Sequence, residues 1–184
     1  MITISSLWLS ILISAILVWI ASAIVWMVLP HHKSDFSRVA KEEAARAALS
    51  GLQPGQYNIP HCASQAELKE PEMQKKFAEG PLAFVTVLPN GLPPMGKKMA
   101  LSFVFNLVVG VAVAYLVSRT LAPDADYLAV FRISATIAWL AYGFATIPDA
   151  IWFGRPWSVI VKNLGDALLY ALLTGGVFGW LWSQ

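Results

Sequence analysis

Ionisable side chains inside apolar stretches are the residues of this sequence with the clearest potential for chemistry. Asp166 lies in a long apolar segment, where a carboxylate is costly and by default marks a proton or substrate path. Lys162 precedes it by four residues, so the structural interpretation is a local ion pair or a hydrogen bond to another helix. Asn106 is a polar residue of a second apolar segment. Arg132, in a third, is explained by its long side chain reaching the membrane interface.

The histidines are the other candidate chemical groups. His31, His32 and His61 are all the histidines of the chain, and with Asp35 they could bind a metal or supply an axial cofactor ligand. Adjacent residues at a helix end are expected to point in different directions, and no paired cysteine or histidine spacing accompanies them. We therefore predict a basic cluster at the membrane interface, with no bound metal and no cofactor.

Motifs of the common enzyme classes do not occur in this sequence. It has no glycine-rich phosphate loop, no nucleophile elbow, no His-Glu-x-x-His and no Cys-x-x-Cys. We predict no catalytic residue, and we favour a protein that is not an enzyme. Basic residues between positions 31 and 98 alternate with acidic ones, which argues against nucleic acid as a partner.

The composition predicts where these side chains lie, because 57% of the 184 residues are apolar and only 13% are charged. A soluble domain has roughly a quarter charged residues, so the solvent of this chain is expected to be a lipid bilayer. Spanning it takes about 20 apolar residues in a helix. Four segments pass that test, and the fold class is predicted to be an all-α membrane protein with four transmembrane helices. The predicted divisions are 1–30, 99–118, 127–147 and 157–182 for the helices and 31–98 for a polar insert.

The insert is predicted to be a small α+β unit. Its helices are expected from a Ser37 cap onward and after Pro71, and its strands over 56–59 and 82–88. Two strands alone are marginal in water. We therefore expect Phe84, Val85 and Val87 to be buried against these helices, the membrane surface or another protein.

The distribution of lysine and arginine predicts the orientation in the membrane. Most of these residues lie in the 31–98 insert, and Arg155 lies in the connection before the last apolar segment. Cytoplasmic flanks collect lysine and arginine, so the insert is expected in the cytoplasm and both termini outside.

Small residues recur at four-residue spacing along two of the apolar segments. Such ridges let helices approach closely in lipid, where no hydrophobic effect drives them together. We interpret them as helix-packing surfaces within one bundle, with contact to a second protein as the alternative. The residues are Gly110 and Ala114 beside Asn106 in one segment, and Ala167, Ala171, Gly175 and Gly179 in the other.

Three short motifs resemble a loosely defined group of uncharacterised bacterial inner-membrane proteins. They are Trp26-Met27-Val28-Leu29-Pro30-His31-His32-Lys33, Trp152-Phe153-Gly154-Arg155-Pro156-Trp157 and Phe178-Gly179-Trp180-Leu181-Trp182. The resemblance implies a bacterial origin, a multi-pass inner-membrane location and a four-span layout. It implies no activity, substrate or catalytic residue.

Three functional hypotheses follow. The leading one is a non-enzymatic accessory, assembly or stabilising subunit of a larger membrane complex, with lipid and other membrane subunits, or further copies of this chain, as partners. The second is a small transporter or channel that uses Asp166, Asn106 and Tyr170 along a polar seam. The third is a redox or quinone-linked component that uses the histidines at the interface.

Overall fold

A computed structural model describes residues 2–182. The chain forms two compact units, which are described separately. One is a helical unit that includes the chain up to Phe36 and again from Pro94 onward. The other, Ser37–Pro93, is inserted between two helices of the first.

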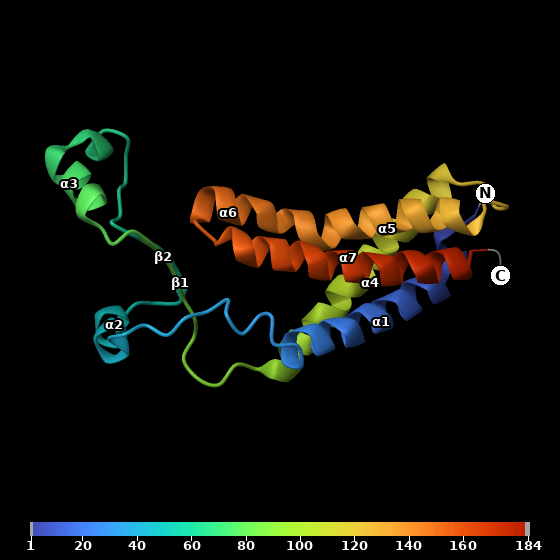
Figure 1. Cartoon of the computed structure of the whole chain (residues 1–184), viewed down its shortest axis with the longest axis horizontal. Coiled ribbons are helices and arrows are strands. Elements are labelled where there is room, and N and C mark those ends of the chain that lie inside the picture. The colour runs from blue at the N-terminus through green and yellow to red at the C-terminus, as the bar shows by residue number, and fades with distance from the viewer. Residues whose placement is uncertain (1, 183–184) are drawn as a thin grey trace. The chain divides into compact units, whose positions relative to one another are not determined.

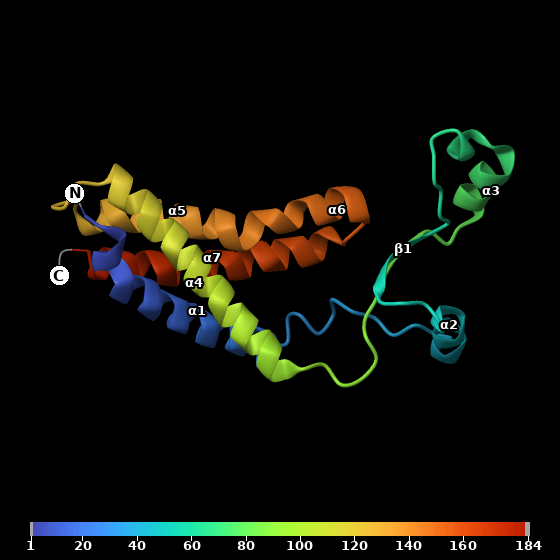
Figure 2. The ribbon, with the colours of Figure 1, turned by 180° about the vertical axis from the view of Figure 1, so that it is seen from behind.

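Long helices build the helical unit (Figure 1). It starts with a short 3-10 turn, η1 (Ile4–Leu7), which leads into α1. The helices α4, α5 and α7 follow after the inserted unit, and Figure 2 shows α4 crossing in front of the others when the bundle is seen from behind. Their bounds are α1 (Trp8–Met27), α4 (Met95–Thr120), α5 (Tyr127–Gly143) and α7 (Trp157–Trp180).

Three of the described helical stretches are long and apolar enough to cross a membrane, where the sequence predicted four. They cover Ile4–Met27, Met95–Thr120 and Tyr127–Phe153. The helix α7 has the necessary length, but Lys162, Asn163 and Asp166 lower the hydropathy of its first half. Residues 2–182 are thus mostly helical, with three candidate membrane spans and one small sheet.

The third candidate span continues beyond its predicted end at residue 147. After α5, a 3-10 turn η3 (Phe144–Thr146) passes directly into α6 (Ile147–Phe153). Pro148 is the second residue of α6. Backbone N–H groups in the first turn of a helix have no partner within the helix, so the missing N–H of proline costs no hydrogen bond there. Gly154 ends α6 with a φ of 68°, a left-handed conformation that favours glycine.

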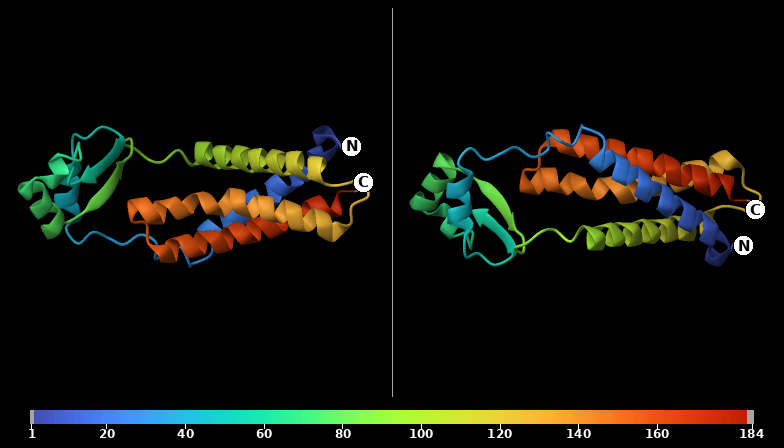
Figure 3. Two further views of the ribbon diagram at one scale, coloured as in Figure 1. Left: turned by 90° about the horizontal axis from the view of Figure 1, so that it is seen from above. Right: turned by 90° about the horizontal axis from the view of Figure 1, so that it is seen from below.

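The small residues of the predicted ridges lie where helices of this unit approach each other. Gly175 of α7 faces Ala135 and the backbone of Phe131 on α5, and the two views of Figure 3 show these helices side by side. On α4, Gly110 faces Ile11 of α1. Ala114, Ala167 and Ala171 are buried, and Gly179 packs against the ring of Tyr127.

Indole N–H groups join segments that are far apart in the sequence. Each donates to a backbone carbonyl, which replaces the water that a lipid environment does not provide. The bonds run from Trp19 to Met99 (3.0 Å), from Trp139 to Leu164 (3.1 Å) and from Trp182 to Ala122 (3.2 Å).

The inserted unit contains a single antiparallel strand pair within its described residues. The strands β1 (Gly55–Ile59) and β2 (Ala83–Val87) pair with Tyr57 opposite Val85. Its helical elements are α2 (Glu42–Leu49), η2 (Glu67–Lys69) and α3 (Pro71–Glu79). The helix α2 starts at Glu42, later than the predicted Ser37 cap.

Of the covers expected for the hairpin, the helices of the inserted unit do not bury Phe84. This side chain is 61% exposed within the chain, whereas Val85 and Val87 are half-buried. Successive residues of a strand point to opposite faces, so a strand that covers Val85 and Val87 must present Phe84 on the other side.

The packing of α7 against α5 predicts that replacing glycine with alanine changes the free energy of unfolding in opposite directions at two positions of α7. Gly175→Ala places a Cβ 2.8 Å from the Cβ of Ala135 and 3.0 Å from the carbonyl oxygen of Phe131. We expect this overpacking to lower the free energy of unfolding by about 1–3 kcal/mol. Gly165→Ala meets nothing within 4 Å, so the better helix propensity of alanine should raise stability by about 0.5–1 kcal/mol.

Thermal unfolding of the purified protein in mild detergent measures both changes. A Gly175→Ala variant as stable as the Gly165→Ala control would contradict the close α5–α7 approach.

Candidate functional site

The candidate site begins with a sharp turn after α1. The backbone N–H of Val28 still bonds Ile24, and Pro30, which has no N–H to donate, follows where the helix ends. Residues 30–36 then run in turns, closed by N–H bonds from Lys33 to Pro30 (3.0 Å) and from Asp35 to His32 (3.0 Å). The chain folds back here, and its next side chains meet α7.

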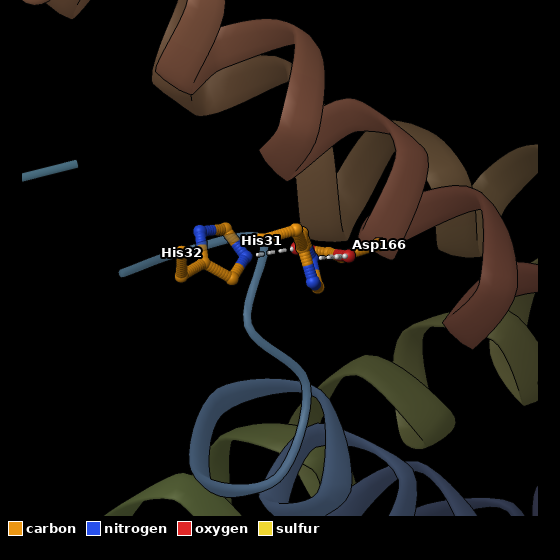
Figure 4. Close-up of side chains that lie close together, drawn as sticks. All are labelled: His31, His32 and Asp166. Atoms are coloured by element: carbon orange, nitrogen blue, oxygen red, sulfur yellow. Dashed lines mark hydrogen bonds and ion pairs between the residues drawn. The ribbon is translucent and has the colours of Figure 1, made fainter. Parts of the chain in front are cut away.

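Asp166 of α7 accepts hydrogen bonds from both histidines of this turn (Figure 4). The Nε2 of His31 lies 3.1 Å from Oδ1, and the Nε2 of His32 lies 2.6 Å from Oδ2. The His32 side chain is only 5% exposed. A carboxylate placed in an apolar helix thus has both of its oxygens bonded.

A second carboxylate holds the other side of His32. Asp35 accepts from the His32 Nδ1 at 2.6 Å through Oδ2, and from the Lys162 Nζ at 2.7 Å through Oδ1. Lys162 donates further to the carbonyl of His31 at 2.6 Å and to the hydroxyl of Ser34 at 2.9 Å. We call His31, His32, Asp35, Lys162 and Asp166 the His–Asp cluster.

The geometry differs from two sequence predictions. Lys162 bonds Asp35 rather than forming the local ion pair with Asp166, because the turn at 30–36 offers both residues of α7 a partner outside their helix. His31 and His32 converge on one carboxylate instead of pointing apart, because they follow Pro30 in a turn and not in a helix.

Trp26 is a member of the site that sequence reasoning missed. Its ring stacks on the His32 imidazole, with centroids 3.9 Å apart and planes 4° from parallel. Stacking on an aromatic face orients the imidazole and favours its protonated form. A six-residue spacing corresponds to neither helical nor strand periodicity, so the sequence did not predict this contact. The turn between Trp26 and His32 brings their rings together.

The hydrogen bonds imply a charged His32. Ionised carboxylates only accept, so His32 donates from both ring nitrogens and is an imidazolium. Burial acts to lower the pKa of His32, but the hydrogen bonds and charges of Asp35 and Asp166 outweigh it and raise that pKa above the usual value. The hydrogen bonds from Lys162 and His32 lower the pKa of Asp35.

A pocket of about 580 Å³ adjoins the cluster within the helical unit. It is lined by residues of α1, α4, α5, η3 and α7, most of them apolar, and Trp26 belongs to both the pocket and the cluster. Its size falls in the range of small-molecule sites. We call it the bundle pocket. Its polar lining includes Asn106, Asn163, Asp166 and Tyr170, with Lys98 among the remaining residues.

Three polar side chains of this lining each have a buried atom with no regular hydrogen bond within the described residues. They are the Asn106 Nδ2, the Asn163 Oδ1 and the Tyr170 hydroxyl, all shielded from solvent. Asn106 and Tyr170 are only 4% and 8% exposed. The Tyr170 hydroxyl is close enough to Trp26 to interact with it, but without regular hydrogen-bond geometry.

Other buried polar groups of the bundle behave differently. Ser14, Ser134 and Thr174 each donate to a carbonyl of the preceding turn of their own helix. Their burial therefore needs no ligand, and the unpaired groups are concentrated at the bundle pocket.

Two of the predicted polar site residues, Arg132 and His61, belong neither to the His–Asp cluster nor to the bundle pocket. Arg132 is an exposed residue of α5 and is not among the residues that line the bundle pocket. His61 belongs to the inserted unit, where its Nδ1 pairs with the Asn58 side chain at 2.9 Å.

The arrangement can do two kinds of chemistry. The bundle pocket offers donors, acceptors and an apolar wall to a small molecule, and Asp166 links it to a protonated histidine. The Nε2 atoms of His31 and His32 and a carboxylate oxygen of Asp166 all lie within 4.8 Å of one another, a spacing that one metal ion can bridge.

No protein-family model, curated protein or solved structure matches this chain.

The charged state of His32 predicts a pH-dependent attachment of the turn to α7. Because the folded-state pKa of His32 is raised, its stabilising contribution is present at low pH and is lost as pH rises through that value. Since the pKa of Asp35 is lowered, the contribution of Asp35 is lost only as pH falls into its acidic titration range.

His32→Ala should therefore lower the melting temperature at pH 6 more than at pH 9, in detergent with a chelator present. His61→Ala, which removes an imidazole outside the cluster, is the matched control. A His32→Ala effect that grows toward pH 9 would reverse the assigned charge.

Proposed function

We propose that this protein is a small transporter of the bacterial inner membrane that binds a solute in the bundle pocket. The supporting observation is the meeting of Asn106, Asn163, Asp166 and Tyr170 around one pocket in an otherwise apolar helix bundle. Asp166, Asn106 and Tyr170 are the three residues of the polar seam expected for a transporter. Polar groups inside membrane helices are expensive, and those of transporters surround the substrate path.

The unpaired groups carry most of this argument. A buried donor or acceptor without a partner costs about 1–3 kcal/mol of stability. Three such atoms at one pocket therefore destabilise the empty protein, and a bound molecule that pairs with them would remove this penalty. A bound solute that accepts from Asn106 and donates to Asn163 would remove that cost. The apolar walls around these groups favour a solute with an apolar body.

Asp166 would couple solute binding to the charged His–Asp cluster. Its carboxylate is shared between the bundle pocket and the His–Asp cluster. A solute that hydrogen-bonds Asp166 competes with His31 and His32 for the same oxygens. Binding would therefore loosen the turn after α1, which is the kind of two-state contact that alternating access needs.

The four-span layout and the orientation belong to this proposal. The helix α7 is the proposed fourth span, because the partners supplied by the turn reduce the cost of placing Lys162 and Asp166 in it. The lysine-rich inserted unit is then cytoplasmic and both chain ends are outside.

The other two hypotheses have less support. The small-residue ridges that suggested an accessory subunit pack against helices of the same chain, so they do not call for a second protein. Of the imidazoles expected to serve a redox component, His31 and His32 are bonded to Asp166 and His61 pairs with the Asn58 side chain.

Removing one unpaired donor tests the solute site. The purified protein is screened by thermal shift in detergent against aliphatic amino acids, aromatic amines and nucleosides, which combine an apolar part with a donor and an acceptor. We expect one class to stabilise the wild type, and Asn106→Leu to weaken that binding about tenfold, the loss of one hydrogen bond worth about 1.4 kcal/mol.

Ser118→Ala is the matched control on α4, because the Ser118 hydroxyl bonds Tyr115 in its own helix. The stabilising class is then used as the labelled solute in proteoliposome uptake. Equal binding by Asn106→Leu and the wild type, or no uptake of any bound solute, would refute the transporter.

The orientation can be tested with the chain's single cysteine. Cys62 lies in the inserted unit and is partly exposed. A membrane-impermeant maleimide should leave it unlabelled in intact cells and label it after lysis. Cys62→Ser combined with Ser183→Cys should show the opposite, with labelling in intact cells.

A further inference from the structure

We propose that His31, His32 and Asp166 bind one divalent transition-metal ion of the zinc class, which fastens the turn after α1 to α7. This site shares Asp166 with the solute site, but it does not depend on transport. It rests on the ligand types, their separations and the groups that orient them.

The ligand atoms are close to a metal-binding arrangement. Zinc bonds to imidazole nitrogen and carboxylate oxygen are about 2.0–2.2 Å, which separates neighbouring ligand atoms by roughly 3.3 Å in a tetrahedron. The His31 Nε2 already lies 3.1 Å from Asp166 Oδ1. The His32 Nε2 lies 2.6 Å from Oδ2, so a small rotation of the carboxylate admits an ion.

The surroundings of His32 match those of a metal-bound histidine. Such ligands commonly donate their second ring N–H to a carboxylate, which fixes the ring orientation. His32 donates its Nδ1 proton to Asp35, whose side chain is only 2% exposed, and Trp26 stacks on the ring. Its Nε2 is thereby aimed at the position between His31 and Asp166.

The charges around the site accommodate a divalent cation. Lys162 pairs with Asp35 and not with Asp166, so its charge is offset outside the ligand set. When an ion binds, it takes the place of the proton on the His32 Nε2, because only a neutral nitrogen can ligate. Three protein ligands leave a fourth position for a water molecule or a further group.

Zinc titration of the chelator-treated full chain in detergent tests this proposal. Isothermal titration calorimetry with zinc chloride should give one saturable site per chain. His31→Ala and Asp166→Asn should weaken zinc binding by on the order of 100-fold or more, and Asp35→Asn by about tenfold, the size of effect that second-layer partners have. His61→Ala should bind like the wild type.

X-ray absorption on the zinc-loaded wild type keeps the test independent of how well the variants fold. It should show two imidazole nitrogens and carboxylate oxygen at about 2.0–2.2 Å. No saturable binding, wild-type affinity in both His31→Ala and Asp166→Asn, or a zinc environment without imidazole would each overturn the site. Failure here leaves the solute site untouched, since Asn106→Leu tests that separately.

Discussion

The structure of the helical unit depends on how the charges of α7 are satisfied. Asp166 and Lys162 lie in a helix whose other residues are mostly apolar, and neither has a partner within that helix. Charges taken out of water require hydrogen-bonded counterparts. The turn after α1 supplies them as His31, His32 and Asp35. The end of α1 is thereby attached to the first half of α7, and the position of this attachment places Trp26 and Asp166 at the bundle pocket.

Two kinds of polar environment meet at Asp166. In the His–Asp cluster, both carboxylates, both ring nitrogens of His32 and the Lys162 ammonium have bonded partners. At the bundle pocket, the Asn106 Nδ2, the Asn163 Oδ1 and the Tyr170 hydroxyl have no such pairing among the described residues. A lipid-facing bundle gains little from a polar group that it leaves unpaired. This contrast is why the pocket, and not the ridges of small residues, supports the functional proposal.

Two differences from the sequence predictions have the same origin, a turn that the local pattern did not reveal. The Lys162–Asp166 pair was expected from helical spacing, which describes neighbours within one helix and says nothing about a partner from another segment. His31 and His32 were treated as helix-end residues that diverge, whereas Pro30 begins a turn in which they converge.

The amino-acid sequence alone determined the apolar segments, the polar insert, its two strands and the unusual position of Asp166. These properties are local, since composition and periodicity over some twenty residues set them. Only the tertiary structure decided that Asp35, His32 and Asp166 form one network, and that Asn106 and Tyr170 share a pocket with Asp166. Residues far apart in the sequence meet there because helix packing and a single turn bring them together, and no local periodicity encodes such contacts.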